Sequence, residues 1–72
     1  MRDAAVHPIV KRLREARLSQ GYSLVKLGEI SGYEGTHIWN IEAGKIRAKV
    51  EILEDLAQCL GMTIVLKERG DE

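Results

Sequence analysis

Residues 23–45 carry the stretch SLVKLGEISGYEGTHIWNIEAGK, and this stretch decides the fold of the 72-residue chain. Its first half contains Leu24, Leu27 and Ile30 at three-residue spacing. Apolar residues that recur in this way line one side of a helix. The spacing therefore predicts a short helix over residues 24–31 whose apolar stripe faces a core.

Ser23 and Gly32 flank this helix and mark its two ends. A serine hydroxyl before the first turn accepts a hydrogen bond from a backbone N–H that has no partner inside the helix. A glycine after the last turn adopts a left-handed backbone at little cost. Gly28, in the middle, disfavours the helix by about 1 kcal/mol relative to alanine. We expect its lack of a side chain to let the next helix approach closely.

A second helix is predicted over residues 35–43, with Ile38 and Ile41 on its buried side and Gly44 after its end. Its opposite side carries small and polar residues around a tryptophan: Gly35, Thr36, Trp39, Asn40 and Ala43. Helices of about eight or nine residues do not persist alone in water, so the rest of the chain must hold the two at a fixed angle. A helix-turn-helix has this arrangement, and its second helix enters the major groove of DNA.

Two further helices are predicted around this stretch. The first begins at Pro8, whose missing N–H costs nothing at the first helical position, and ends before Gly21. Its inward residues are Ile9, Val10, Leu13 and Ala16. The second spans residues 49–60 and ends before Gly61. Its inward residues are Val50, Leu53, Leu56, Ala57 and Leu60. The predicted fold class is therefore all-α, a compact four-helix domain.

The C-terminal segment, residues 62–67, is short and β-branched, which predicts a strand. The sequence offers it no second strand, and a lone strand leaves backbone groups without partners. We expect it to pair with the same segment of a second copy around a two-fold axis, through Met62, Ile64, Val65 and Leu66. A frayed tail or a short fifth helix is the alternative. The predicted organisation is a flexible arm at 1–7, the domain at 8–61, this dimerisation strand, and a flexible tail at 68–72.

The net charge is zero, but the charges are unevenly distributed. Residues 1–49 hold nine Lys and Arg against five Asp and Glu, whereas residues 50–72 hold two against six. Such asymmetry between halves suggests an electrostatic partner, and the positive half contains the two central helices. Solvated charges without a partner are the alternative.

The residues give no sign of catalysis or of a metal. Cys59 is the single cysteine and lies among apolar neighbours, so we expect a reduced core thiol. His7, His37 and Cys59 lack the spacing of zinc ligands. No residue pair suggests a nucleophile with its base. We therefore expect no enzyme activity, metal or cofactor. Without an apolar run or secretory pattern, a cytoplasmic protein that does not enter membranes is expected.

At residues 13–60 the chain resembles the lambda-repressor-like, Cro/Xre-type helix-turn-helix proteins. The most specific part is the series G-x-x-x-x-x-I-x-x-I-E-x-G-K, residues 32–45. The markers of the resemblance are Arg17, Gly21, Ser23, Leu27, Gly32, Ile38, Ile41, Glu42, Gly44, Lys45, Leu53, Leu56, Ala57, Leu60 and Gly61. A C-terminal strand resembles that of HipB-like antitoxins, in which it builds a shared two-stranded sheet.

The resemblance implies a homodimeric transcriptional regulator, a repressor, that binds an inverted-repeat operator in double-stranded DNA. It also implies a partly buried ion pair between Arg17 and Glu42. The positions that read bases in this family fall on Gly35, Thr36 and Asn40, with Trp39 beside them. Those that contact phosphates fall on Ser23, Lys45, Arg47 and Lys49. Asn40 has the amide that pairs with adenine N6 and N7.

Three positions depart from the family pattern. Leu24 stands where a phosphate-anchoring glutamine is common, Glu34 where serine or threonine caps the reading helix, and Gly35 where a long polar reader is common. These departures favour recognition through Thr36, Asn40 and the shape of the DNA. Two alternatives stay open. One is an antitoxin or adaptor whose acidic residues 51–55 and tail hold a protein partner such as a toxin. The other is a helix-turn-helix that no longer binds DNA.

Overall fold

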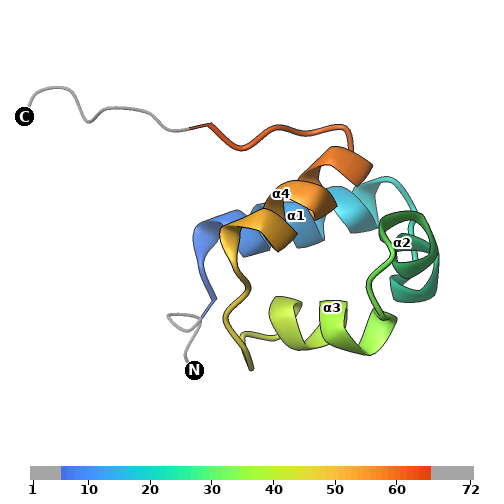
Figure 1. Ribbon diagram of the computed structural model, residues 1–72. Helices are drawn as coiled ribbons and strands as arrows, with labels where there is room; N and C mark the ends of the chain where they lie inside the picture. The colour runs from blue at the N-terminus through green and yellow to red at the C-terminus, as the bar shows by residue number, and fades with distance from the viewer. Residues whose placement is uncertain (1–5, 66–72) are drawn as a thin grey trace, which may run out of the picture.

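The computed structural model describes residues 6–65, which form four helices and, within that range, no strand (Figure 1). The helices are α1 (Pro8–Ser19), α2 (Leu24–Ser31), α3 (Gly35–Glu42) and α4 (Val50–Cys59). Both α1 and α2 contact α3 and α4, so the first two helices join the last two. The predicted all-α, four-helix fold is confirmed. No helix in this part of the chain combines the length and the apolar character that a membrane crossing requires.

The start of α1 is capped by a histidine. His7 directly precedes Pro8, which occupies the first turn. The Nδ1 atom of His7 accepts a hydrogen bond of 3.1 Å from the Ile9 N–H. The acceptor satisfies one of the backbone donors that a helix start leaves without an intrahelical partner. The helix then runs to Ser19, and Gly21 turns the chain with a φ of 77°.

Local signals fix both ends of α2. The Ser23 hydroxyl oxygen accepts a hydrogen bond of 3.0 Å from the Lys26 N–H, as an N-cap serine does. At the other end, Gly32 has a φ of 88° and donates its N–H to the Gly28 carbonyl oxygen at 2.8 Å. The bounds of α2 coincide with those predicted from the sequence.

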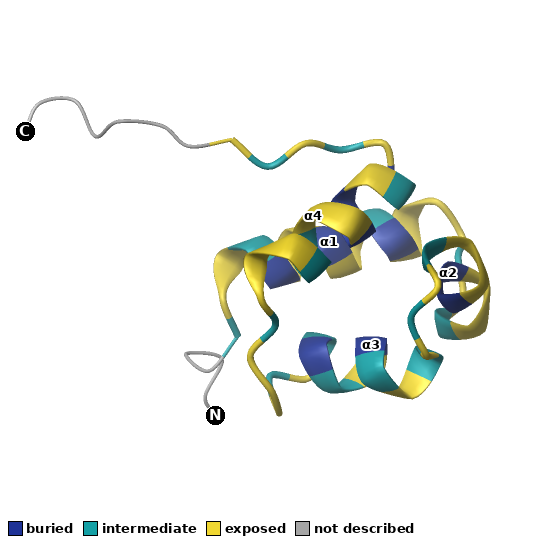
Figure 2. Ribbon diagram, in the orientation of Figure 1, coloured by how far each residue is buried: buried dark blue, intermediate teal, exposed yellow. Residues whose placement is uncertain are grey.

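The core lies where the inward sides of the four helices meet, and Figure 2 shows its buried segments facing one another. Its main cluster consists of Leu13, Leu27, Ile38, Leu56, Ala57 and Leu60. Each of the four helices contributes at least one residue to this cluster. The short helices therefore depend on one another for stability.

Two residues predicted to face the core are exposed. Ile30 is 44% exposed because α2 turns its 24–27–28–31 side inward, as a 3.6-residue period requires. Strict three-residue spacing drifts around the helix and carries the third residue out of the contact. Val50 is 54% exposed because it is the first residue of α4, and the helix first packs against the core at Ile52 and Leu53. Both expectations were wrong.

The segment after α4 lies along the helices. The Met62 N–H donates to the Ala57 carbonyl oxygen at 2.8 Å, and the Gln20 side-chain amide donates to the Leu60 carbonyl oxygen at 2.8 Å. Met62 and Ile64 pack against the core cluster, whereas Thr63 and Val65 are exposed. Residues 62–65 form no strand in this structure, so the strand predicted over residues 62–67 is not confirmed. Leu66, most of the predicted arm at 1–7, and the tail at 68–72 lie outside the described residues.

Candidate nucleic-acid interface

Two glycines bring α2 and α3 into close contact. A Cβ built on Gly28 would lie 2.7 Å from the Tyr33 carbonyl oxygen and 3.3 Å from the Gly35 nitrogen. A Cβ on Gly35 would lie 3.3 Å from the Leu24 carbonyl oxygen. All three distances are shorter than ordinary van der Waals contacts, so a side chain at Gly28 would force the two helices apart. The close approach expected for Gly28 is present.

The α3 helix buries one side and exposes the other (Figure 2). Ile38 and Ile41 are 1% and 3% exposed and face the core. Thr36 and Trp39 are exposed, Trp39 by 46%, and Asn40 is half-buried. The structure therefore gathers three of the residues predicted to read bases on one accessible side of a helix. We call this set, Thr36, Trp39 and Asn40, the outer face of α3.

Gly35 differs from the other predicted reading residues. It is half-buried at the first position of α3, against the backbone of Leu24. The absence of a side chain there is explained by helix packing, and a base contact by Gly35 stays a prediction. Glu34 occupies the N-cap of α3 and makes no side-chain capping hydrogen bond. Its carboxylate is exposed beside the outer face.

The residues predicted to bind phosphates lie directly before α2 and in the loop after α3. Lys45, Arg47 and Lys49 are all exposed in the loop between α3 and α4. Ser23 is exposed at the start of α2, where its hydroxyl oxygen is the cap acceptor. A hydroxyl group is also a donor, so the same serine retains an O–H for a phosphate oxygen. Whether these residues touch DNA stays a prediction.

An ion pair fixes α3 against α1. Arg17 Nε and Nη2 donate to Glu42 Oε2 and Oε1, each at 2.8 Å, and Arg17 Nη1 donates to the Tyr22 carbonyl oxygen at 2.8 Å. The two side chains are 8% and 9% exposed. Arg14 adds a longer contact, 3.7 Å from its Nε to Glu42 Oε1. This is the pair that the resemblance implied, with a further bond that holds the turn after α1.

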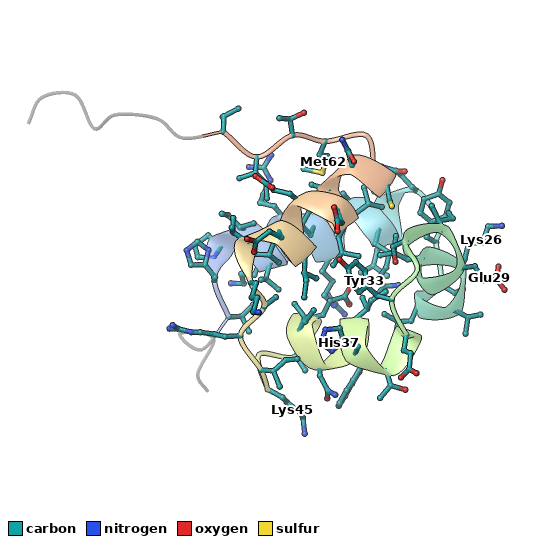
Figure 3. All side chains as sticks on the ribbon, in the orientation of Figure 1. Lys26, Glu29, Tyr33, His37, Lys45 and Met62 are labelled. Atoms are coloured by element: carbon teal, nitrogen blue, oxygen red, sulfur yellow. The ribbon has the colours of Figure 1, made fainter. Side chains whose placement is uncertain are left out.

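A second link was not predicted, and it joins the turn that follows α2 to helix α4. The Tyr33 hydroxyl donates to Asp55 Oδ2 at 2.6 Å, and this hydrogen bond raises the pKa of Tyr33, with desolvation and the charge of Asp55 acting in the same direction. The Tyr33 and His37 rings lie 6.2 Å apart between centroids, on the inner side of the loop and α3 (Figure 3). Tyr33 and Asp55 are 22 residues apart, so no local pattern connects them.

The described residues hold no cluster of three or more His, Cys, Asp or Glu side chains that would suit a metal ion. Cys59 is half-buried and makes no disulfide there.

Comparison with protein families finds a match for this chain. The family model described as "Helix-turn-helix domain" matches residues 9–69, which covers most of the chain, α1 from its second residue onward, and the whole of α2, α3 and α4. No curated protein and no solved structure matches it. The match confirms the resemblance at the level of the Cro/Xre-like helix-turn-helix proteins, in which α2 and α3 form the motif, and it suggests a DNA-binding regulator. The HipB-like subtype stays a prediction. The chain belongs to the helix-turn-helix domain family.

Proposed function

We propose that this protein is a sequence-specific transcriptional regulator that represses by binding an inverted-repeat operator as a homodimer. The observation that carries the proposal is that Thr36 and Trp39 are exposed and Asn40 is half-buried on one side of α3, while Ile38 and Ile41 hold the other side on the core. A helix held in this way can be inserted into a major groove without any change in the fold.

Each polar residue of the outer face has a matching chemistry on DNA. The amide of Asn40 donates to adenine N7 and accepts from adenine N6, and Thr36 offers either a hydroxyl or a methyl group for thymine. Lys45, Arg47 and Lys49 neutralise phosphates on either side of the groove. Because the released counterions return at high salt, the affinity falls steeply as the salt concentration rises.

A second copy completes the site, because one α3 reads only half of an inverted repeat. Met62 and Ile64 turn inward while Thr63 and Val65 turn outward, an alternation typical of a strand. In Figures 1 and 3 this segment leaves α4 on the side away from α3 and Lys45. Pairing the segment with its copy would therefore leave both outer faces accessible. The two α3 helices would then enter successive major grooves about 34 Å apart.

Selection of bound duplexes from a random DNA pool tests this function. We expect enrichment of an inverted repeat with half-sites one helical turn apart. The enriched duplex should bind far more tightly than a single half-site, as measured by the anisotropy of a labelled duplex. Recovery of unrelated sequences, or no binding even at low salt, would contradict the proposal.

The second candidate function is an antitoxin or adaptor that holds a protein partner and binds DNA for autoregulation. It is favoured by the exposed carboxylates of Glu51, Glu54 and Asp55 on α4, beside a groove of about 250 Å³ that also involves Met62 and Ile64. A basic protein encoded by the neighbouring gene and copurifying with this chain would support that function. Loss of the complex in a Glu51→Lys/Glu54→Lys variant, with DNA binding retained, would assign this surface.

A further inference from the structure

The backbone turn at the end of α3 fixes the position of Lys45. Gly44 has a φ of 79° and donates its N–H to the Ile41 carbonyl oxygen at 3.1 Å. The next residue, Lys45, donates its N–H to the Asn40 carbonyl oxygen at 2.9 Å. These two bonds form a Schellman motif, in which the chain folds back over the last helical turn. The backbone of Lys45 is thereby fixed next to Asn40.

The side chain of Lys45 is held as well. Its Nζ lies 5.2 Å from the centroid of the Trp39 ring, within the range of a cation–π contact. Lys45 remains exposed in this contact, so the ring does not enclose the ammonium group. Figure 3 shows Lys45 projecting from the end of α3, away from α1 and α4. Among the described residues, the carboxylate nearest this end, Glu42, pairs with Arg17 and Arg14 and not with Lys45.

We propose that Trp39 is a positioning residue that holds the Lys45 ammonium ready for a DNA phosphate at the edge of the outer face of α3. The proposal rests on the proposed DNA-binding function and adds a role that base reading does not include. An ammonium group has three N–H donors, and the ring engages it from one side, so donors remain for a phosphate oxygen.

Fixing the lysine in advance explains why a large aromatic residue occupies an exposed position. A mobile lysine loses much of its rotamer freedom when it binds a phosphate, whereas a lysine already held by a ring loses less. The contact with Trp39 is therefore a means of raising affinity without adding a charge. Because every DNA sequence carries phosphates, the gain applies to all duplexes alike.

The contact is tested first in the protein without DNA. Ring currents of Trp39, the only tryptophan in the chain, should shift the side-chain proton resonances of Lys45 upfield. We expect Trp39→Leu to abolish this shift and Trp39→Tyr to keep part of it. Unshifted Lys45 resonances in the natural protein would overturn the proposal.

Binding to duplexes then separates positioning from direct contact. Trp39→Leu should weaken binding to all duplexes about two- to fivefold, the size of an exposed cation–π contact, with Trp39→Tyr restoring most of the loss. Its salt dependence should remain, whereas Lys45→Met should flatten the slope of log K against log salt by about 0.9 per chain. Circular dichroism of each variant verifies the fold.

The double variant Trp39→Leu/Lys45→Met decides the question. If Trp39 acts through Lys45, the double variant binds as weakly as Lys45→Met alone. If the two losses add, Trp39 contacts DNA by itself and the proposal is overturned. Equal binding by the natural protein and Trp39→Leu overturns it as well, whereas failure of the natural protein to bind any duplex at low salt overturns the proposed DNA-binding function.

Discussion

Arg17 and Glu42 face each other through two parallel hydrogen bonds of 2.8 Å, although they are 25 residues apart in sequence. The pair joins the last turn of α1 to the last residue of α3. Arg17 also donates to the Tyr22 carbonyl oxygen, so one guanidinium holds both the turn after α1 and the end of α3. The angle at which α3 presents its outer face depends on this arrangement.

Replacing one partner of this pair should strongly destabilise the fold. We expect Arg17→Met to lower the free energy of unfolding by about 3–5 kcal/mol, because the Glu42 carboxylate would be left buried without its partner. Urea denaturation followed by circular dichroism measures the loss. Arg12→Met, on the exposed side of the same helix, is the control and should change stability by less than about 0.5 kcal/mol.

A double variant distinguishes a stranded charge from lost packing. In Arg17→Met/Glu42→Met both charges are absent, so much of the lost stability should return. A double variant as unstable as the sum of the single variants would mean that the pair is not coupled. A loss below about 1 kcal/mol in Arg17→Met would mean that solvent replaces the pair without cost.

Gly28→Ala should destabilise the protein even though alanine favours helices. Propensity alone predicts a gain of about 1 kcal/mol. The new methyl group, however, would meet the Tyr33 carbonyl oxygen at 2.7 Å, and overpacking typically costs about 1–3 kcal/mol. We expect a net loss of stability, seen as a lower midpoint of thermal denaturation. Ser19→Ala, at the exposed end of α1, is a nearly neutral control. A more stable Gly28→Ala protein would show that the turn can move aside.

The helices could be predicted from the sequence because their ends carry local signals. Ser23 and Gly32 determine α2 through bonds to residues three or four positions away, and Gly61 acts in the same way after α4. Pro8 favours the start of α1 because no intrahelical partner exists there for the N–H that it lacks. The exposed outer face of α3 also followed from the spacing of Ile38 and Ile41. Such features depend on the helical period and on short-range capping alone.

Features that depend on tertiary contacts were not predictable in this way. The bond from Tyr33 to Asp55 joins distant residues, and the exposure of Ile30 depends on which side of α2 meets its neighbours. The contact between Lys45 and Trp39 requires the left-handed backbone of Gly44 together with the hydrogen bonds that the N–H groups of Gly44 and Lys45 donate to α3. Strand pairing of the C-terminal segment involves a second chain and stays a prediction.

Stability at alkaline pH should depend on Tyr33. Its hydrogen bond to Asp55 raises its pKa above 10.0, so the folded state holds the proton more tightly than the unfolded state. The resulting stabilisation is fully present below pH 10.0 and is lost as the pH rises through the raised pKa. The free energy of unfolding, measured by denaturation at increasing pH, should therefore fall more steeply for the natural protein than for Tyr33→Phe. Parallel curves would indicate that the hydrogen bond does not persist in solution.

Asn40→Ala should relax the sequence preference. We expect a loss of about 1–3 kcal/mol of discrimination at one base pair of each half-site, because the paired bonds to adenine are removed. Competition between the selected duplex and single-base variants measures this loss. Lys49→Ala is the matched control and should weaken all duplexes equally. If Asn40→Ala also weakened every duplex equally, Asn40 would be a backbone contact and not a base reader.

Dimerisation through the C-terminal segment can be tested without disturbing the core. Val65 is 73% exposed, so Val65→Asp leaves the folded chain intact but places a charge in the proposed strand pair. We expect the natural protein to sediment as a dimer and Val65→Asp as a monomer that binds only half-sites. Val25→Asp alters a valine of similar exposure, 67%, on α2 and should stay dimeric. A Val65→Asp protein that remains a dimer would exclude this segment as the interface, because two like charges would then have to lie together within an apolar strand pair.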